Sequence, residues 1–336
     1  MIRRATLADL PAVTTLFAHT VRNVSIRHYD AAQVAAWAAG SENVDRWQER
    51  LTQHHFLVTE QGGQLTGMAS LTAEGYLDVL FVHADHQGNG IASRLLGRLL
   101  HHAAAQRLAR VTTEASITAR PVFESMGFRV VQAQQVEVRG QWFRNYRMEV
   151  SVPPPMLETR RLLLFPFTLA DATDFYALNQ DPDVMRYTGD TAFSSFREAR
   201  AFLEHYSETT YRPYGYGRWT VLRRETGEYL GWCGLKYLPE LGETDLGYRF
   251  YRHAWGQGYA TEAARACLTY GFEMLGLTRV VGRALRANDA SIRVLEKVGM
   301  HFEKLFPSAK PRAFATRWTS TPTRRRRPPD FIPTLF

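Results

Sequence analysis

The sequence contains little cysteine and no long apolar segment. Its two cysteines, Cys233 and Cys267, belong to no Cys-x-x-Cys pair, which argues against a disulfide scaffold or a zinc ribbon. The longest apolar run, 162–167, is broken by Pro166 and is far shorter than the roughly 20 residues of a membrane-spanning helix. Asp9 lies where a secretory signal would be apolar. We therefore expect no metal site, no membrane segment and a cytoplasmic protein.

Charge is low outside the C-terminal end. The formal net charge is +8, and residues 308–336 contribute +6 of it through seven Lys or Arg and one Asp. The first 307 residues therefore carry only +2. Nucleic-acid binding is not indicated for this part of the chain, and would depend on the Arg/Pro-rich segment around Arg324–Arg327.

Length and a proline run divide the chain into two parts. Its 336 residues fit two domains of about 150 residues each. Residues 151–156 contain three consecutive prolines, which favour an extended linker. We predict domains at 1–150 and 157–306, a linker at 151–156, and an Arg/Pro-rich, disordered tail at 307–336.

The two parts repeat the same landmarks in the same order. TLAD occurs at 6–9 and 168–171, Gly-x-Gly-x-Ala at 88–92 and 256–260, and Glu-x-x-Gly-apolar at 124–128 and 296–300. Thr followed by Asp three residues later is typical of a helix N-terminus. The repeated order predicts two copies of one fold, and two unrelated α/β domains are the alternative.

Each copy has the pattern of a mixed α/β (α+β) fold. A strand and helices precede a hairpin at 55–71, with its turn at 61–63, and a second hairpin at 218–235, with its turn at 225–227. A further strand and the glycine loop lead into helices at 91–105 and 260–275, then strands at 110–115 and 279–285 and a short helix. The closing strands of the first copy, 128–138 and 141–150, have no visible counterpart after Phe306.

The glycine loops carry the strongest chemical signal. A strand, Gly-x-Gly-x-Ala and a helix place backbone N–H groups at the positive end of a helix dipole, where glycine lets an anion approach closely. We expect a phosphate or pyrophosphate there, and a purely structural turn is the alternative. No Gly-Lys-Ser/Thr follows, and each loop lies in mid-domain after a hairpin, so neither a P-loop nor a dinucleotide-binding fingerprint is indicated.

These motifs resemble those of the GNAT superfamily of N-acetyltransferases. QGNGIA, Gln87–Ala92, matches the family's Gln/Arg-x-x-Gly-x-Gly/Ala signature, whereas WGQGYATEA, Trp255–Ala263, has Trp at the Gln/Arg position. That departure, together with LETRRLLL (157–164), GWCGLKYL (231–238) and NDASIRVLEKVGM (288–300), is similar to the RimJ/RimL type of ribosomal-protein N-terminal acetyltransferase. The first part resembles a stand-alone GNAT domain. The resemblance implies two tandem GNAT folds, each with a splayed central sheet flanked by helices.

The resemblance also implies the donor and its binding residues. Acetyl-CoA would place its pyrophosphate on each glycine loop and its pantetheine along one strand of the splayed pair. The implied cofactor-binding residues of the first domain are Leu80, Phe81, Val82, Gln87, Gly88, Asn89, Gly90, Ile91 and Ala92. Those of the second domain are Tyr248, Arg249, Phe250, Trp255, Gly256, Gln257, Gly258, Tyr259, Ala260, Asn288 and Ser291.

Acetyl transfer to a primary amine, either a protein N-terminus or a small molecule, requires a group that accepts a proton. Asp245 is also a carboxylate near the second cleft. For each candidate carboxylate, the alternative is that it is a solvated surface acid without a catalytic role. Phe123 occupies the position at which many GNAT enzymes carry a tyrosine as general acid, so the first domain uses another donor, releases thiolate unaided or is less active. The candidate catalytic residues are Glu114, Asp78, Glu243 and Ser291.

Two other functions stay open. In the first, one domain is catalytic and the other is a degenerate acyl-CoA-binding scaffold, since Phe123 weakens the first domain and the missing final hairpin weakens the second. Alternatively, the arginine-rich tail makes the chain an RNA- or ribosome-associated interaction protein. A further hypothesis is that the final hairpin has been replaced, for instance through a shifted reading frame.

Overall fold

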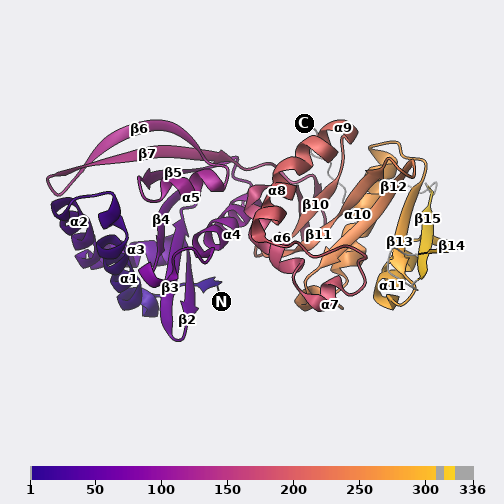
Figure 1. Ribbon diagram of the computed structural model, residues 1–336, viewed down its shortest axis with the longest axis horizontal. Helices are drawn as coiled ribbons and strands as arrows, with labels where there is room; N and C mark the ends of the chain where they lie inside the picture. Colours follow the sequence, from indigo (N-terminus) through magenta and orange to yellow (C-terminus); the bar gives the residue numbers. More distant parts are fainter. Residues whose placement is uncertain (1, 308–313, 322–336) are drawn as a thin grey trace. The chain divides into compact units, whose positions relative to one another are not determined.

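The computed structural model describes residues 2–307 and 314–321 and divides into two compact units, Met1–Val152 and Pro153–Phe336 (Figure 1). Each unit is a mixed sheet with helices packed on it, which confirms the predicted α/β class. In the first unit the strands are β1 (Ile2–Arg4), β2 (His55–Gln61), β3 (Gln64–Leu71), β4 (Tyr76–Val82), β5 (Arg110–Ser116), β6 (Arg129–Val138) and β7 (Gln141–Ser151). Its helices are α1 (Leu10–Asn23), α2 (Ala31–Ala38), α3 (Val44–Gln53), α4 (Ile91–Ala105) and α5 (Arg120–Ser125).

The second unit repeats this plan. Its strands are β8 (Leu157–Glu158), β9 (Leu162–Pro166), β10 (Arg218–Arg223), β11 (Tyr229–Leu238), β12 (Glu243–Phe250), β13 (Val280–Leu285), β14 (His301–Pro307) and β15 (Phe314–Ser320). Its helices are α6 (Ala172–Leu178), α7 (Pro182–Met185), α8 (Phe196–Tyr206), α9 (Arg212–Tyr214), α10 (Tyr259–Glu273) and α11 (Asp289–Lys297).

Both sheets are antiparallel except at one strand pair. The order is β1-β2-β3-β4-β5-β7-β6 in the first unit and β14-β15-β13-β12-β11-β10-β9-β8 in the second. The parallel pairs are β4 with β5 and β12 with β13. Each is joined through the glycine loop and the helix after it, α4 or α10, which is the crossover that a parallel pair requires.

The predicted helix starts are confirmed in both units. The backbone N–H of Thr6 donates to Asp9 Oδ2 at 2.8 Å, and that of Thr168 donates to Asp171 Oδ2 at 2.6 Å. These carboxylates satisfy amides that the first turn leaves without partners. The repeated TLAD motif therefore marks the same structural position twice.

A small residue in the central strand β3 lets α4, the helix after the first glycine loop, pack close to the sheet. Met68 packs in the core cluster formed with α1, α2 and α3. Its neighbour Gly67 points to the other face, where an added Cβ would lie 2.6 Å from Ile91 Cγ2 and 3.2 Å from Leu95 Cδ1. The absence of a side chain thus lets α4 lie directly on the sheet.

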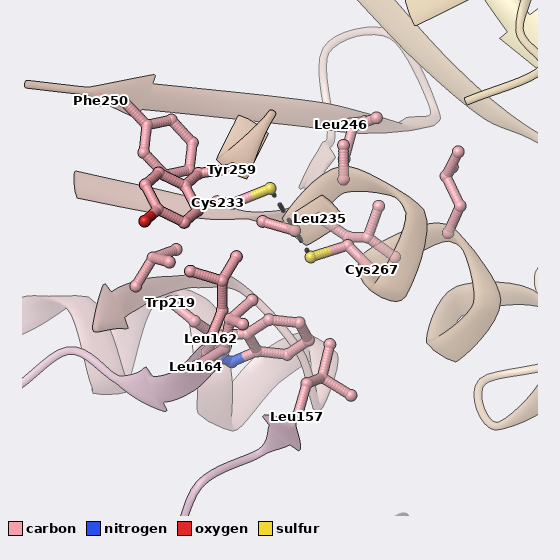
Figure 2. Packing of buried hydrophobic residues seen from close by; sticks show 14 of the residues in the cluster. Leu157, Leu162, Leu164, Trp219, Cys233, Leu235, Leu246, Phe250, Tyr259 and Cys267 are labelled. Atoms are coloured by element: carbon pink, nitrogen blue, oxygen red, sulfur yellow. Dashed lines mark hydrogen bonds between the residues drawn. The ribbon is translucent and has the colours of Figure 1, made fainter. Parts of the chain in front are cut away.

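The core of the second unit gathers β9–β13 and α10 (Figure 2). Cys267 of α10 faces Cys233 of β11, and their sulfur atoms are 3.7 Å apart. Both side chains are fully buried beside Trp219 and Leu235. Burial and the neighbouring thiol raise the pKa of Cys267 well above its ordinary value, so its thiol stays protonated in the core.

The tail boundary from the sequence is corrected at β15. The sequence predicts a disordered tail that includes residues 314–320, yet these residues form a strand that pairs with β13 on one side and β14 on the other. Ala315, Thr316 and Trp318 are buried, and Thr316 Oγ1 donates to the Ala284 carbonyl at 3.0 Å. The strand was missed because hydroxyl side chains fill buried positions where alternation of apolar residues was sought. The described hairpin gives no support to a replaced C-terminal end.

The remainder of that tail, including Arg324–Arg327, lies outside the described residues. Within 2–307 and 314–321, no helix is long and apolar enough to cross a membrane.

Candidate active site

The parallel strands of each unit separate after two residue pairs. β4 and β5 pair at Tyr76–Thr112 and Leu77–Thr113, and β12 and β13 pair at Asp245–Val281 and Leu246–Gly282. Beyond these pairs, the edges of β4 and β12 that face their parallel neighbours carry backbone groups without a strand partner. The predicted splayed sheet is therefore present in both units, and each opening leads toward a glycine loop.

A cavity of about 450 Å³ lies at the opening of the first unit. It is lined by Asp78, Leu80 and Phe81 of β4 and by Glu114 of β5. Helices α1 and α2 and the β6–β7 hairpin contribute Phe17, Trp37 and Phe143 among its other lining residues. The structure thus brings four residues that were singled out in the sequence to one concave site of the size that binds small molecules.

The first glycine loop has the geometry of an anion-binding turn. Gly88 and Gly90 have φ of +76° and +71°, a left-handed conformation that favours glycine. Gly90 is the N-cap of α4, so the first-turn amides of a 15-residue helix face the loop. Gln87 Nε2 donates to the Val82 carbonyl at 2.7 Å and thereby ties the loop to the end of β4.

The second loop repeats that geometry with a different anchoring side chain. Gly256 and Gly258 have φ of +73° and +79°, and Gly258 is the N-cap of α10. Trp255 Nε1 donates to the Phe250 carbonyl at 2.8 Å. Phe250 ends β12 as Val82 ends β4, so the indole N–H makes the bond that the Gln87 amide makes in the first unit.

The other predicted cofactor residues lie as follows. Residues 80–82 and 248–250 form the last parts of β4 and β12, and residues 87–92 and 255–260 form the loops and first helical turns. Arg249 occupies the position that Phe81 has in the first unit, but its side chain is charged. Its guanidinium is buried and donates to Asn179 Oδ1 and to Asp190 Oδ2. Burial lowers the pKa of Arg249.

The two carboxylates of the first cleft have different environments. Asp78 is held by two hydrogen bonds from Arg50, at 2.6 Å from Nε and 3.1 Å from Nη2. Glu114 accepts one longer bond, 3.3 Å from Asn145 Nδ2. Asn145 Oδ1 is buried and has no hydrogen-bond partner in the described part of the chain. Glu114 and Asn145 therefore keep hydrogen-bonding capacity at the cavity, whereas both oxygens of Asp78 are already engaged.

Aromatic residues near these carboxylates offer no obvious proton donor. Phe123 is buried and packs edge-to-face on Phe128 with ring centroids 5.1 Å apart. Tyr76 lines the cavity, but burial and the charges of Glu114 and Asp78 raise the pKa of its hydroxyl to about 12.

The carboxylates of the second cleft are paired with arginines that the sequence did not connect to them. Glu243 accepts a hydrogen bond from Arg317 Nη2 and lies 3.7 Å from Arg279 Nε. Asp245 is buried and accepts bonds from Arg218 at 2.6 Å and from Arg283 at 3.1 Å. Arg218, Arg283 and Arg317 belong to β10, β13 and β15, and Arg279 directly precedes β13, so no local spacing could have indicated these partners.

Ser291 is placed at the opening of the second unit by a chain of hydrogen bonds. Its backbone N–H donates to Asn288 Oδ1 at 3.1 Å, which caps α11. Its hydroxyl lies 2.9 Å from the hydroxyl of Tyr248 on β12. Burial raises the pKa of Tyr248, which keeps that phenol protonated. Three predicted residues are therefore in one contact network across the cleft.

Metal ligation finds no support in the residues that the structure describes, since none of their His, Cys, Asp and Glu side chains gather in a group of three that could hold an ion.

Comparisons with known proteins agree with this geometry. Two family models, each described as an acetyltransferase (GNAT) domain, match residues 25–150 and 161–301. The chain is 40% identical over 139 residues to uncharacterized protein YkkB of Bacillus subtilis, covering 40% of this chain and 77% of that protein. It is 36% identical over 147 residues to uncharacterized N-acetyltransferase YafP of Escherichia coli, covering 44% and 93%. It is 34% identical over 165 residues to FsC-acetyl coenzyme A-N(2)-transacetylase of Aspergillus fumigatus, covering 45% and 68%.

Proposed function

The chain belongs to the GNAT acetyltransferase family as an acyltransferase with two such domains, and on that premise we propose that it moves acetyl from acetyl-CoA to a primary amine within a ternary complex. The acceptor is a protein N-terminal amine or a small-molecule amine. The observation that carries this proposal is the coincidence, in each unit, of a strand opening with a left-handed glycine loop at a helix N-terminus.

The donor fits the residues of both openings. Amides of the loops and first helical turns suit a pyrophosphate, because they add N–H donors to the positive end of α4 or α10. The free edges of β4 at 80–82 and β12 at 248–250 suit the amide groups of pantetheine, which would pair as a strand does. A backbone N–H on these edges would stabilise the negative charge that develops on the thioester oxygen. The acetyl coenzyme A in the name of the Aspergillus relative supports the same donor.

For the first unit we assign the proton acceptor to Glu114 rather than Asp78. Glu114 lines the cavity with a single long hydrogen bond, whereas Asp78 is held by the guanidinium of Arg50. A proton acceptor needs a free lone pair directed at the substrate, and both oxygens of Asp78 already accept hydrogen bonds from Arg50. Since Phe123 supplies no hydroxyl, the thiolate of this unit either takes its proton from another donor or leaves unaided.

The second unit favours a second candidate function. Its carboxylates Glu243 and Asp245 are both paired with arginines, so neither is available as a base. Ser291 and Tyr248 remain as neutral hydroxyls at the opening, where they would contact the thioester sulfur. These contacts favour a unit that binds acyl-CoA and either transfers acetyl through water-mediated proton transfer or serves as a binding module.

The test is calorimetric titration of the full chain with acetyl-CoA. We expect two sites, and one site in each of the variants Gly90→Val and Gly258→Val, because a β-branched residue is strained at these φ values. An added Cβ at Gly90 meets no atom within 4 Å, and at Gly258 only Arg161 Nη2 at 3.5 Å, so both variants should fold. Absence of any acetyl-CoA binding by the folded chain would contradict the proposal.

Activity then separates the two candidates for the second unit. Coenzyme A release, followed with a thiol reagent in the presence of an amine, should persist in Gly258→Val and fall about a hundredfold when Glu114→Gln is added. Release that persists equally in Gly90→Val would assign transfer to both units. Release that is lost in Gly90→Val would make the second unit a binding module.

A further inference from the structure

The first unit's cavity has an aromatic wall that acetyl transfer alone does not require. Phe17, Trp37, Phe81 and Phe143 come from α1, α2, β4 and β7 and all line the cavity. The ring centroids of Phe17 and Phe81 are 4.9 Å apart, those of Trp37 and Phe81 6.2 Å, and those of Trp37 and Phe143 6.0 Å, all edge-to-face. Such packing fixes the rings against one another, so the wall is formed in advance of binding.

Tyr29 completes this wall with its ring and not with its hydroxyl. The hydroxyl donates to the Arg144 carbonyl at 3.1 Å and accepts the Ile117 N–H at 3.0 Å. The ring lies 5.6 Å from Trp37 and 5.4 Å from Phe143, centroid to centroid. Since the polar atom is satisfied within the protein, this side of the cavity presents apolar surface to an acceptor.

The same cavity also holds a hydrogen-bond acceptor that has no donor. Asn145 is about nine-tenths buried, lines the cavity, and has no donor for its Oδ1 in the described residues. Its Nδ2 donates to Glu114, which fixes the amide orientation and leaves Oδ1 as an acceptor. A buried oxygen without a donor is costly unless a ligand supplies one. An ammonium or amine N–H between Asn145 and Glu114 would do so.

The charged groups that line the cavity show a surplus of guanidinium. They are Arg46, Arg50, Arg139, Asp78 and Glu114. Arg50 and Asp78 neutralise each other, and Arg139 is anchored above α2 by a 3.1 Å bond from Nη1 to the Ala36 carbonyl. Arg46 and Arg139 therefore oppose one carboxylate, Glu114. This balance suits a molecule with one amine and one anionic group, and it repels a polyamine.

Resting on the proposed acetyl transfer, we propose that the acceptor of the first unit is a free amino acid with an aromatic or bulky apolar side chain. The side chain lies against the aromatic wall, the amine lies at Glu114 and Asn145, and the carboxylate faces Arg46 and Arg139. Glu114 takes one proton from the ammonium, and the free amine attacks the thioester carbonyl. As the C–N bond forms, the nitrogen loses a second proton, which balances the one that the thiolate takes up. A C–N bond forms, the C–S bond breaks, and the thiolate takes up a proton, so that N-acetyl amino acid, coenzyme A thiol and one net proton are the products.

The experiment uses the full chain carrying Gly258→Val, in which only the first unit reports. Coenzyme A release is measured with L-phenylalanine, L-leucine, phenethylamine, which lacks the carboxylate, and spermidine. We expect kcat/KM for phenylalanine to exceed that for phenethylamine and for spermidine at least tenfold. Arg46→Ala with Arg139→Ala should raise KM for phenylalanine about tenfold without changing that for phenethylamine. Arg22→Ala, which removes an exposed arginine outside this cavity, is the matched control.

Three outcomes would overturn the inference. Spermidine as the better acceptor would show that the rings hold a cation instead. Equal use of phenethylamine and phenylalanine would remove the role of the two arginines. Acetyl-CoA binding without turnover of any of the four amines would refute this acceptor class while leaving donor binding intact. Loss of acetyl-CoA binding itself would instead count against the proposed function, and calorimetry on the same sample distinguishes the two failures.

Discussion

Single side chains anchor the two glycine loops through the same carbonyl position, with an amide N–H from Gln87 and an indole N–H from Trp255. We predict that Trp255→Phe weakens acetyl-CoA binding at the second unit about three- to tenfold, since one hydrogen bond that orders the loop is lost. Trp255→Gln should bind within about twofold of the parent chain. Calorimetry in the Gly90→Val background measures both, and equal weakening by Phe and Gln would show that the ring matters rather than its N–H.

A histidine pair predicts acid sensitivity of the first unit. His55 stacks on His102 with ring centroids 3.6 Å apart, and burial, His102 and Arg4 lower the pKa of His55 to about 3. The unfolded chain takes up a proton near pH 6.5, whereas the folded chain does not until about pH 3. The stabilising effect of the neutral imidazole is therefore complete above pH 6.5 and is lost as the pH falls toward 3.

The variant His55→Phe should remove about one proton from the uptake on unfolding between pH 4 and 6. Urea unfolding at several pH values, followed by tryptophan fluorescence, gives this uptake as the slope of the unfolding free energy against pH. His28→Phe, at an exposed position, serves as the control and should leave the slope unchanged. A slope that is the same for His55→Phe and the parent would contradict the assignment.

The sequence predicts the role of a site residue where a local motif defines that role. It does not predict the role where the residue's partner lies far away in the chain. The loop glycines follow from their own spacing. No local motif indicates that Asp78, Glu243 and Asp245 are paired with arginines. Asp78 pairs with an arginine 28 residues away, Glu243 with one 74 residues away, and Asp245 with two that lie 27 and 38 residues away. Ionic pairing over such separations depends on the sheet register, which sequence alone does not supply.

At the scale of elements, we predict that removal of β15 lowers the stability of the second unit. It lies between β13 and β14 and buries Trp318, whose ring packs edge-to-face on Phe302 at 5.8 Å. A chain ending at Pro307 should lose stability in its second unit and expose two strand edges to aggregation. A chain ending at Thr321 keeps the whole strand and should match the full chain.

Thermal unfolding of the two truncated chains measures the change in stability. Acetyl-CoA titration of the same truncations in the Gly90→Val background measures binding by the second unit alone. Trp318→Ala provides a milder change with an expected loss of about 3–5 kcal/mol. If the chain ending at Pro307 unfolds at the temperature of the full chain, β15 contributes little to the unit.

The same strand shows which elements sequence could predict. The helix 91–105 was predicted at its observed bounds, because a glycine N-cap and a long apolar-periodic stretch define both its ends. The hairpins of β2–β3 and β10–β11 followed from their glycine turns. β15 contains two threonines, a serine and an arginine, and it is buried only because strands pair on both its sides.

At the scale of the molecule, each unit has its own core. One cluster gathers α1–α3 with β2–β4, and the other gathers α10 with β9–β13. We predict that residues 1–152 and 153–336, produced as separate chains, each unfold cooperatively and each bind one acetyl-CoA. Circular dichroism and calorimetry test this. A fragment that is unfolded alone but folds when the other is added would show that the units depend on each other.

The shared anchor of the two loops also has a consequence for how such sequences are recognised. A signature that requires glutamine or arginine before Gly-x-Gly describes one way to donate an N–H to the carbonyl of the strand's last residue. Trp255 donates an N–H to the same carbonyl position from an indole ring. In this chain the loop is therefore anchored by an N–H donor that two different residue types supply. A search pattern written as donor geometry would detect both copies here, whereas one written in residue letters detects only the first.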